Sequence, residues 1–194
     1  SMMTALEQLE AENLLPIKVY AMLSLRDEKL MEKRIEKGPD KDLDSMLVTR
    51  SVKAYYDGAL GSRGARLLFD YSDQPGHRGI SGDGYGFNEA LMSRAMKQGF
   101  QVAIHAIGDA GNREAIDILE KVFNEDPSTR LNRHRIEHAQ ILHPDDLPRL
   151  SQLGIIASME PAHAVEDKTW AEDRLGSDRV KGAYAWRSIR ESGA

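Results

Sequence analysis

Two histidines stand at the ends of short segments that have the composition of buried strands. These segments are 101–105, which ends in His105, and 134–138, which ends in His138, with one helical stretch at 112–123 between them. Their separation is about the length of one strand–helix–strand unit in a parallel sheet. Neighbouring parallel strands end at the same carboxyl edge, where α/β proteins place their chemistry. Two imidazoles that converge there suggest a metal site, because imidazole is a common metal ligand.

A lysine ends another predicted strand in a similar position. Alternation along 46–54 places Lys53 on the same face as Thr49 and Ser51. A lysine that points inward is costly to bury unless it is neutralised, paired or modified. A neutral lysine reacts with carbon dioxide to form a carbamate, an anionic group that binds metals. The residues alone leave two interpretations of this lysine and the two histidines open: a metal site, or structural hydrogen bonding.

Other polar residues near these strand ends have two interpretations each. Asp109 follows His105 and precedes a helix, so it either caps that helix or orients the histidine. His163 follows a strand and a proline, and is either a substrate contact or an exposed loop histidine. The strand at 134–138 carries charged residues on the face opposite to His138, and alternation alone does not explain them. Of the remaining histidines, His77 and His143 are expected at the surface and His134 is expected in the core.

Composition restricts both the class of protein and the kind of metal site. The chain has 194 residues, of which 41 % are hydrophobic and 29 % charged, and its net charge is −5. It has no basic stripe, which argues against a nucleic-acid partner, and no apolar run near the ~20 residues of a membrane span. No signal-peptide pattern is present, so we expect a cytoplasmic protein. Cysteine is absent, so a metal must be held by His, Asp, Glu or a lysine carbamate.

Predicted strands and helices alternate along the chain. The strands are predicted at 17–23, 46–54, 101–105, 134–138 and 155–159, and the helices at 5–13, 27–37, 87–98, 112–123 and 144–153, with a helical tail from 167. This pattern, without hairpin signals, predicts one α/β domain with a parallel sheet over 1–194. The Gly-rich connection at 57–86 is long enough to suggest a functional loop. Two alternative functions therefore stay open, a non-catalytic α/β ligand-binding module and a flavodoxin-like enzyme. No Walker or G-x-G-x-x-G pattern supports either of them.

Five separated stretches resemble the amidohydrolase superfamily, and within it the YtcJ-like, exoenzyme-regulatory branch of metal-dependent hydrolases. They are 52–63 (VKAYYDGALGSR), 105–109 (HAIGD), 133–140 (RHRIEHAQ), 157–163 (ASMEPAH), and 174–176 with 183–188 (RLG and AYAWRS). Their order and spacing also match, over nearly the whole chain. Glu160 departs from the family pattern, which usually has glutamine there, and it adds negative charge on the expected substrate side.

The resemblance implies a (β/α)8 barrel beside a small β-sandwich, with a centre of one or two divalent ions. This chain would supply a partial barrel, roughly strands three to seven. By the same resemblance, Lys53 is the strand-four lysine and carbamate candidate, and His105 and His138 are the ligands of strands five and six. The remaining residues carried over are Asp57 and His163 for substrate binding, with Asp109 beside Lys53 as a catalytic candidate.

The reaction implied is hydrolysis of a C–N bond in a small amide, formamide or cyclic amide by metal-activated water, with zinc as the expected metal. The family's other ligands are a His-x-His pair on strand one and an aspartate after strand eight, and the 194 residues contain no His-x-His. A complete barrel needs ~250 residues. We therefore expect an internal piece of a longer enzyme, inactive by itself, that forms homo-oligomers through its open sheet edges.

Overall fold

The strands of the protein form one parallel sheet. The computed structural model describes residues 2–42 and 44–194. The strands are β1 Val19–Ser24, β2 Leu47–Tyr55, β3 Gln101–Ala106, β4 Arg135–His138 and β5 Ile156–Ser158. They are hydrogen-bonded in chain order and every pair is parallel. Within the described residues β1 and β5 are the two ends of this sheet, which is therefore an open arc.

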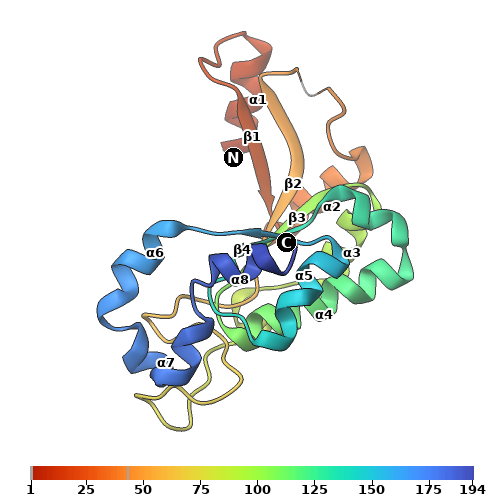
Figure 1. The fold of residues 1–194 in the computed structure, drawn as a ribbon. Helices are drawn as coiled ribbons and strands as arrows, with labels where there is room; N and C mark the ends of the chain where they lie inside the picture. The colour runs from red at the N-terminus through yellow and green to blue at the C-terminus, as the bar shows by residue number, and fades with distance from the viewer. Residues whose placement is uncertain (1, 43) are drawn as a thin grey trace.

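A helix follows each of the first four strands, as the βα pattern predicted (Figure 1). These helices are α2 Glu28–Lys37, α3 Glu89–Lys97, α4 Asp109–Glu125 and α5 Leu147–Leu153. α1 Met2–Ala11 precedes the sheet, and the helices that follow it are α6 Pro161–Glu166, α7 Ala171–Arg179 and α8 Trp186–Glu191. Short 3-10 helices lie at Gly82–Tyr85, Pro127–Asn132, Pro144–Asp146, Asp167–Thr169 and Val180–Gly182. Among the described helices, none is both long and apolar enough to cross a bilayer. The architecture is a partial (β/α)8 barrel.

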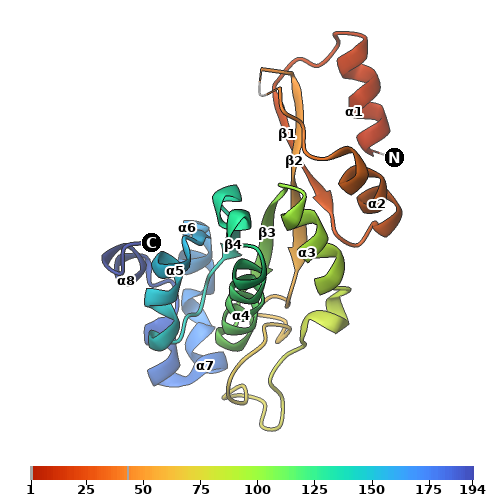
Figure 2. The ribbon, with the colours of Figure 1, turned by 90° about the vertical axis from the view of Figure 1, so that its right-hand side faces the viewer.

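The main core lies between one face of the sheet and the helices α2 to α5. Val102 and Ile104 alternate toward this core from β3, and Ile116 and Leu119 meet them from α4; all four are fully buried. Burying each such side chain contributes roughly 1.5–3 kcal/mol. Figure 2 shows α3, α4 and α5 in a row along the sheet. His105 lies on the opposite face of the sheet, away from this apolar core.

The long connection after β2 is a packed part of the fold. Tyr71 belongs to a second apolar cluster with Ile107, which follows β3, and Leu175 of α7. The Tyr71 hydroxyl donates a hydrogen bond of 2.8 Å to the Ala65 carbonyl. This cluster lies beyond the carboxyl ends of β2 and β3 and fixes the segments that follow both strands.

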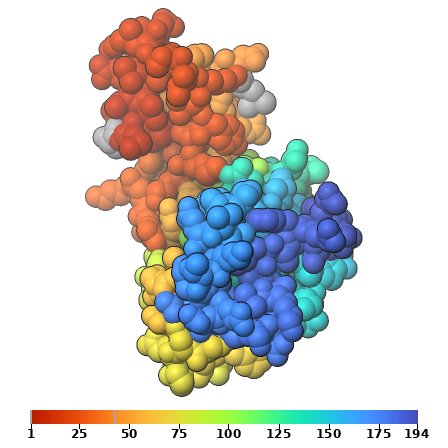
Figure 3. Space-filling view, turned by 60° about the vertical axis from the view of Figure 1, so that its left-hand side comes forward, coloured from red at the N-terminus to blue at the C-terminus, as the bar shows by residue number. Residues whose placement is uncertain are grey.

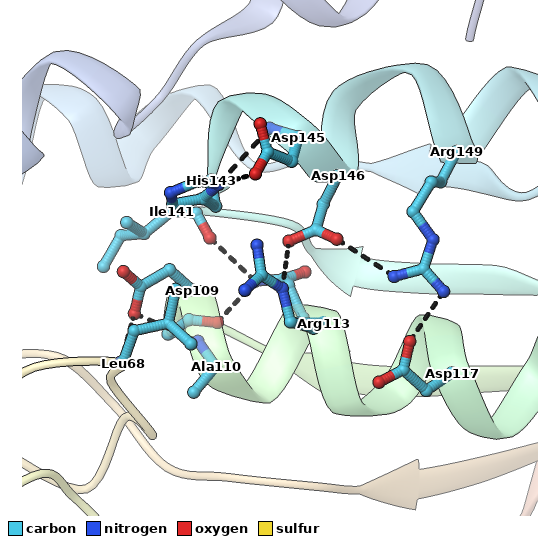
Figure 4. Close-up of polar contacts among 12 residues, drawn as sticks. Leu68, Asp109, Ala110, Arg113, Asp117, Ile141, His143, Asp145, Asp146 and Arg149 are labelled. Atoms are coloured by element: carbon cyan, nitrogen blue, oxygen red, sulfur yellow. Dashed lines mark hydrogen bonds and ion pairs between the residues drawn. The ribbon is translucent and has the colours of Figure 1, made fainter.

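A buried carboxylate docks α5 on α4 (Figure 4). Asp146, which is 2 % exposed, lies just before α5. Its carboxylate accepts hydrogen bonds from Arg113 Nε at 2.8 Å and from Arg149 Nη1 at 3.0 Å. Arg149 also donates to Asp117 of α4 at 2.6 Å. Two guanidinium groups therefore compensate the burial of one carboxylate between the helices.

β2 contains an irregularity that simple alternation did not predict. Thr49 and Ser51 pair with consecutive residues of β1, Ala21 and Met22, so one extra residue of β2 lies between them. Because consecutive strand residues face opposite sides, Thr49 and Ser51 also face opposite sides. The expectation that Thr49 shares a face with Lys53 is therefore wrong, since a bulge reverses the parity before it.

The amino-terminal part of the chain projects from the rest of the molecule. α1, β1 and the first half of β2 form this lobe, which stands clear of α6 to α8 (Figure 3). Several large apolar side chains of the lobe are exposed, among them Ile17 at 68 %, Tyr20 at 49 % and Met22 at 38 %. In the described part of the chain, the β1 edge of the sheet thus has no further strand partner and is partly apolar.

Candidate metal centre

The two strand-end histidines meet at the carboxyl edge of the sheet. His105 lies near the end of β3 and His138 ends the adjacent β4. Their ring centroids are 4.5 Å apart, and the ring planes cross at 71°. The side chains are largely buried, with 13 % and 14 % of their surface exposed. The structure thus brings together the pair that sequence spacing predicted to converge.

His138 reaches this position through an unusual backbone. In the register of β3 and β4, His105 pairs with Glu137, and His138 pairs with the buried Ala106. Strand alternation would therefore turn His138 toward the helices. Instead φ is 76° at His138 and 42° at Ala139, both in the left-handed region, which costs an L-residue about 1–2 kcal/mol. This turn of the chain brings the imidazole of His138 against His105.

The charged residues of β4 lie on the same face of the sheet as His105. Arg135 and Glu137 alternate with Ile136, which belongs to the main core. Arg135 Nη2 lies 2.7 Å from Glu137 Oε1. An ion pair inside the arc of the sheet therefore explains the charges that alternation left unexplained.

Each of the two histidines has a ring nitrogen suited to bind a metal. Nε2 of His105 and Nδ1 of His138 are buried and have no hydrogen-bond partner among the described residues. Carboxylate oxygens of Asp57 and Glu160 lie 3.6 Å from these nitrogens, respectively. Burial lowers the pKa of His105 to about 3 and also lowers the pKa of His138, so both are neutral at pH 7. A buried nitrogen without a partner costs about 1–3 kcal/mol, and neutral imidazoles of this kind fit a divalent transition metal.

Lys53 lies beside the two histidines. It is half-buried near the end of β2, and its Nζ is 5.1 Å from the ring centroid of Tyr55. That ring is in turn 5.4 Å from the His105 ring. Burial lowers the pKa of Lys53, and the positive charge of Lys53 helps to lower the pKa of both His105 and His138. The three residues that the sequence proposed as metal ligands therefore share one site.

Asp57 lies next to His105, with its Oδ1 3.6 Å from His105 Nε2. Its carboxylate is fully buried and accepts hydrogen bonds from the backbone N–H groups of Ile107 at 2.9 Å, Gly108 at 2.8 Å and Arg66 at 2.9 Å. Burial raises the pKa of Asp57 to about 7, although these three donors oppose the rise. Complete burial does not fit the substrate-binding role expected for Asp57. Its contacts hold the segment after β3 in place behind His105.

Asp109 lies apart from the histidines. It is 4 % exposed, and its Oδ1 accepts hydrogen bonds from the backbone N–H groups of Leu68 at 2.9 Å and Ala110 at 3.0 Å (Figure 4). Gly108 occupies the N-cap position of α4, so the N-cap interpretation of Asp109 is wrong. No contact of Asp109 with His105 occurs among the described residues. Its contacts join the long connection after β2 to the start of α4, which does not fit a catalytic role.

His163 joins the site from the first turn of α6. Its ring stacks on that of His138, with centroids 5.2 Å apart and planes at 18°. His163 Nε2 is 3.0 Å from Glu160 Oε2, and His163 Nδ1 is 2.9 Å from Gln140 Oε1. The structure therefore places His163 among the candidate ligands rather than in an exposed loop.

The other histidines have structural contacts. His134 is buried in the core, as predicted: Val102 N–H donates to its Nδ1, and its Nε2 donates to the Thr129 carbonyl, both at 2.9 Å. His77 and His143, expected at the surface, are half-buried. His77 bonds the Arg63 carbonyl at 2.8 Å, and His143 accepts from the backbone N–H of Asp145. Each of these histidines has a bonding role in the fold.

Comparison with known protein families places these strands and histidines in a recognised family. A model of the amidohydrolase family matches residues 1–194. The chain belongs to the amidohydrolase family. The family resemblance seen in the sequence is thereby confirmed. Protein LONG AFTER FAR-RED 3 of Arabidopsis thaliana is 38 % identical over 168 residues, which are 86 % of this chain and 28 % of that protein. The YtcJ protein of Bacillus subtilis (strain 168) is 33 % identical over 143 residues, which are 74 % of this chain and 26 % of that protein.

Two solved structures of metal-dependent hydrolases superpose on this amidohydrolase. The uncharacterized metal-dependent hydrolase from Pyrococcus furiosus matches with a TM-score of 0.80 and 31 % identity, covering 97 % of this chain and 38 % of that one. The corresponding protein from Pyrococcus horikoshii OT3 matches with a TM-score of 0.80 and 30 % identity, covering 98 % of this chain and 37 % of that one. The chain thus spans between about a quarter and two-fifths of the length of these relatives.

The amidohydrolase site contains residues to which the sequence reasoning gave no role. Glu137 faces the histidines through ordinary strand alternation, a signal that was present in the sequence. Gln140 is 3 % exposed and holds His163. Tyr184, some forty residues further along the chain, contacts Gln140 at 3.2 Å through its hydroxyl. The Gln140 and Tyr184 contacts depend on how α6 and the tail fold back, which no local pattern predicts.

Proposed function

We propose that this chain is the part of a metal-dependent amidohydrolase that holds a divalent ion, with zinc as the expected metal, and that the enzyme cleaves C–N bonds of small amides. The observation that carries the proposal is the contact of His105 with His138, ring centroids 4.5 Å apart. Each ring has one buried nitrogen without a hydrogen-bond partner. The family match and the metal-dependent hydrolases that share the fold support this function.

The chain's own residues prepare this centre. When bound, a divalent ion of this kind lowers the pKa of its water toward ~7 and polarises the substrate carbonyl. His105, His138 and Lys53 would hold it. Burial keeps both imidazoles neutral, which is the form that binds a metal. Asp57 fixes the backbone that follows His105 through the N–H groups of Ile107 and Gly108, and joins it to the long connection after β2 through the N–H group of Arg66.

A carbamate on Lys53 is part of the proposal. Burial lowers the pKa of Lys53, and the neutral amine is the form that reacts with carbon dioxide. The carbamate would replace a cation by an anionic ligand beside two neutral histidines, which favours a divalent ion. Glu137 and Glu160, whose charges act on Lys53, would remain close enough to influence it.

We also propose that residues 1–194 have no hydrolytic activity by themselves. They contain no His-x-His pair, and the five strands of the described sheet are fewer than the eight of the barrel that the family resemblance implies. A catalytic zinc site uses about three protein ligands together with a base that accepts the water proton. A cytoplasmic location stays a prediction from the sequence.

A hybrid enzyme tests the function. Residues 1–194 replace the matching segment of the Pyrococcus furiosus hydrolase, which completes the barrel, and the zinc-loaded hybrid is assayed against formamides, linear amides, cyclic amides and matched esters. We expect zinc-dependent hydrolysis of at least one C–N class, reduced by at least ~100-fold in His105→Ala and unchanged in His143→Ala. A folded, zinc-loaded hybrid that cleaves only esters would contradict the C–N assignment. Turnover by the isolated chain, lost on His105→Ala, would contradict its inactivity.

A further inference from the structure

A second set of donor atoms lies at the carboxyl edge, one residue of which is shared with the proposed hydrolase centre. His138, Glu160 and His163 each offer a ligand atom, and these atoms all lie within 4.8 Å of one another. Glu160 Oε1 is 3.6 Å from His138 Nδ1, and Glu160 Oε2 is 3.0 Å from His163 Nε2. Ligand atoms at ~2.0–2.1 Å from a tetrahedral zinc ion are about 3.3 Å apart. The two separations, which involve different oxygens of Glu160, lie on either side of that value.

The nitrogen of His138 that belongs to this set has no other partner. Nδ1 is buried and makes no hydrogen bond within the described chain. It faces Glu160, whose side chain is 57 % exposed. The set therefore combines a buried, unsatisfied nitrogen with a carboxylate that is open to solvent, as expected of a site that an ion can enter.

A half-buried network fixes a hydrogen on Nδ1 of His163. The amide nitrogen of Gln140 donates to Asp167 Oδ2 at 3.0 Å and to the Tyr184 hydroxyl at 3.2 Å. The Tyr184 hydroxyl itself donates to Asp167 Oδ2 at 2.7 Å. The Gln140 carbonyl is thus left to accept from His163 Nδ1 at 2.9 Å. His163 Nδ1 therefore donates to Gln140, and Nε2 is the ring nitrogen that faces Glu160.

A ring nitrogen and a carboxylate oxygen 3.0 Å apart attract each other when a positive charge lies between them, which is a proton on Nε2 or a metal ion that replaces it. Metal-bound histidines typically donate their other N–H to a fixed acceptor, which orients the ring and raises its basicity as a ligand. Gln140 has this relation to His163. The side chain of Glu160 is a carboxylate, which binds a divalent ion better than an amide does.

We propose that His138, Glu160 and His163 bind one divalent transition-metal ion, with Gln140 as a positioning residue that orients His163. Two imidazoles and one carboxylate are a ligand set that zinc commonly takes, with a fourth position left for water. All three ligands lie within this chain. The site is therefore complete without the further ligands that the proposed hydrolase centre requires. The proposal does not rest on the proposed function.

Zinc binding by the isolated 194-residue chain tests the proposal. The probe is ZnCl2 added to metal-free protein at neutral pH and followed by isothermal titration calorimetry. We expect one zinc ion per chain, with affinity at least ~10-fold weaker in Glu160→Gln and in His163→Ala. The matched control is Glu166→Gln, which removes an exposed carboxylate from the same helix and leaves the affinity unchanged. His105→Ala distinguishes the two ligand sets. Both use Nδ1 of His138, so an ion in one set excludes an ion in the other, and an ion held by Glu160 and His163 does not require His105.

The positioning role of Gln140 has its own readout. Gln140→Met keeps the length of the side chain but removes the acceptor, and we expect zinc affinity to fall 10–100-fold, roughly the effect of losing such a partner. The visible spectrum of bound Co2+ should also change, because the His163 ring is no longer held in one orientation. Thermal unfolding of the metal-free variants establishes that they are folded.

Three results would overturn the proposal. They are a folded chain that binds no zinc, equal affinity in the wild type, Glu160→Gln and His163→Ala, and loss of binding in His105→Ala. Loss of zinc in His105→Ala would assign the ion to the hydrolase centre and leave the proposed function intact. Conversely, an inactive hybrid enzyme would remove the proposed function without affecting the zinc titration of the isolated chain.

Discussion

His138 lies against His105 although the two residues have opposite parity in paired strands. The register pairs His105 with Glu137, whereas His138 pairs with Ala106, yet the imidazole rings are 4.5 Å apart. A left-handed backbone at His138, with φ of 76°, makes the contact possible. The fold thus accepts backbone strain at the turn that assembles the candidate centre.

Because φ is positive at His138, glycine should be more stable than alanine at this position, the reverse of the usual order within a strand. We expect His138→Gly to be more stable toward urea than His138→Ala by about 0.5–1 kcal/mol, because only alanine has a Cβ that opposes positive φ. Glu137, the neighbouring strand residue, is not among the residues with positive φ. There Glu137→Ala should be more stable than Glu137→Gly by roughly the same amount. Equal preferences at the two positions would contradict the account of the turn.

His134 should make the protein less stable in mild acid. Burial lowers its pKa to about 4, against ~6.5 in the unfolded chain. The unfolded state therefore binds more protons between these values, and the free energy of unfolding falls as pH drops from about 6.5 to 4, by up to about 3 kcal/mol. Above pH 6.5 this contribution is fully present. Urea unfolding of His134→Gln across the same range should lack this part of the pH dependence, whereas an identical slope would contradict it.

The Asp146 ion pairs should be essential for the docking of α5. Asp146→Asn leaves Arg113 and Arg149 without their shared carboxylate, and we expect a loss of roughly 3 kcal/mol in the free energy of unfolding. Asp145 is the matched control, because its side chain is 80 % exposed. Asp145→Asn should change stability by less than about 0.5 kcal/mol. Similar losses in both variants would mean that the buried position of Asp146 is unimportant.

We propose that the open sheet edge leads to self-association. β1 pairs only with β2 in the described sheet, and Tyr20 on it is 49 % exposed. Sedimentation velocity should show an average mass that rises with concentration, and Tyr20→Lys should reduce the rise by charging the edge. Ile80→Lys, on a loop where Ile80 is 45 % exposed, should leave it unchanged. A monomer at every concentration tested would contradict this prediction.

Local sequence signals were sufficient for most of the fold. Strand segments such as 101–105 and helices such as 112–123 have the periodicity of their structures, and every predicted strand has a counterpart within a few residues. The bulge in β2 was missed because one extra residue changes parity without changing composition. The loop at 57–86 was too irregular to predict, since its order depends on packing against residues such as Leu175 that are remote in sequence.

The site was only partly predictable for the same reason. His105 follows from alternation, but the placement of His138 depends on a φ angle that no residue type at 138 or 139 signals. Asp57 and Asp109 were located near the right strand ends, yet their burial could not be read from the sequence. Gln140 and Glu160 acquire their significance only when α6 brings His163 beside His138.

The most direct test of a metal centre at this edge is anomalous diffraction at the zinc absorption edge, from crystals of the chain grown with zinc. The account predicts an anomalous peak about 2.0–2.1 Å from a ring nitrogen of His138, the residue common to both candidate ligand sets. Zinc found only at His77 or His143, or no peak at the carboxyl ends of β3 and β4, would contradict it.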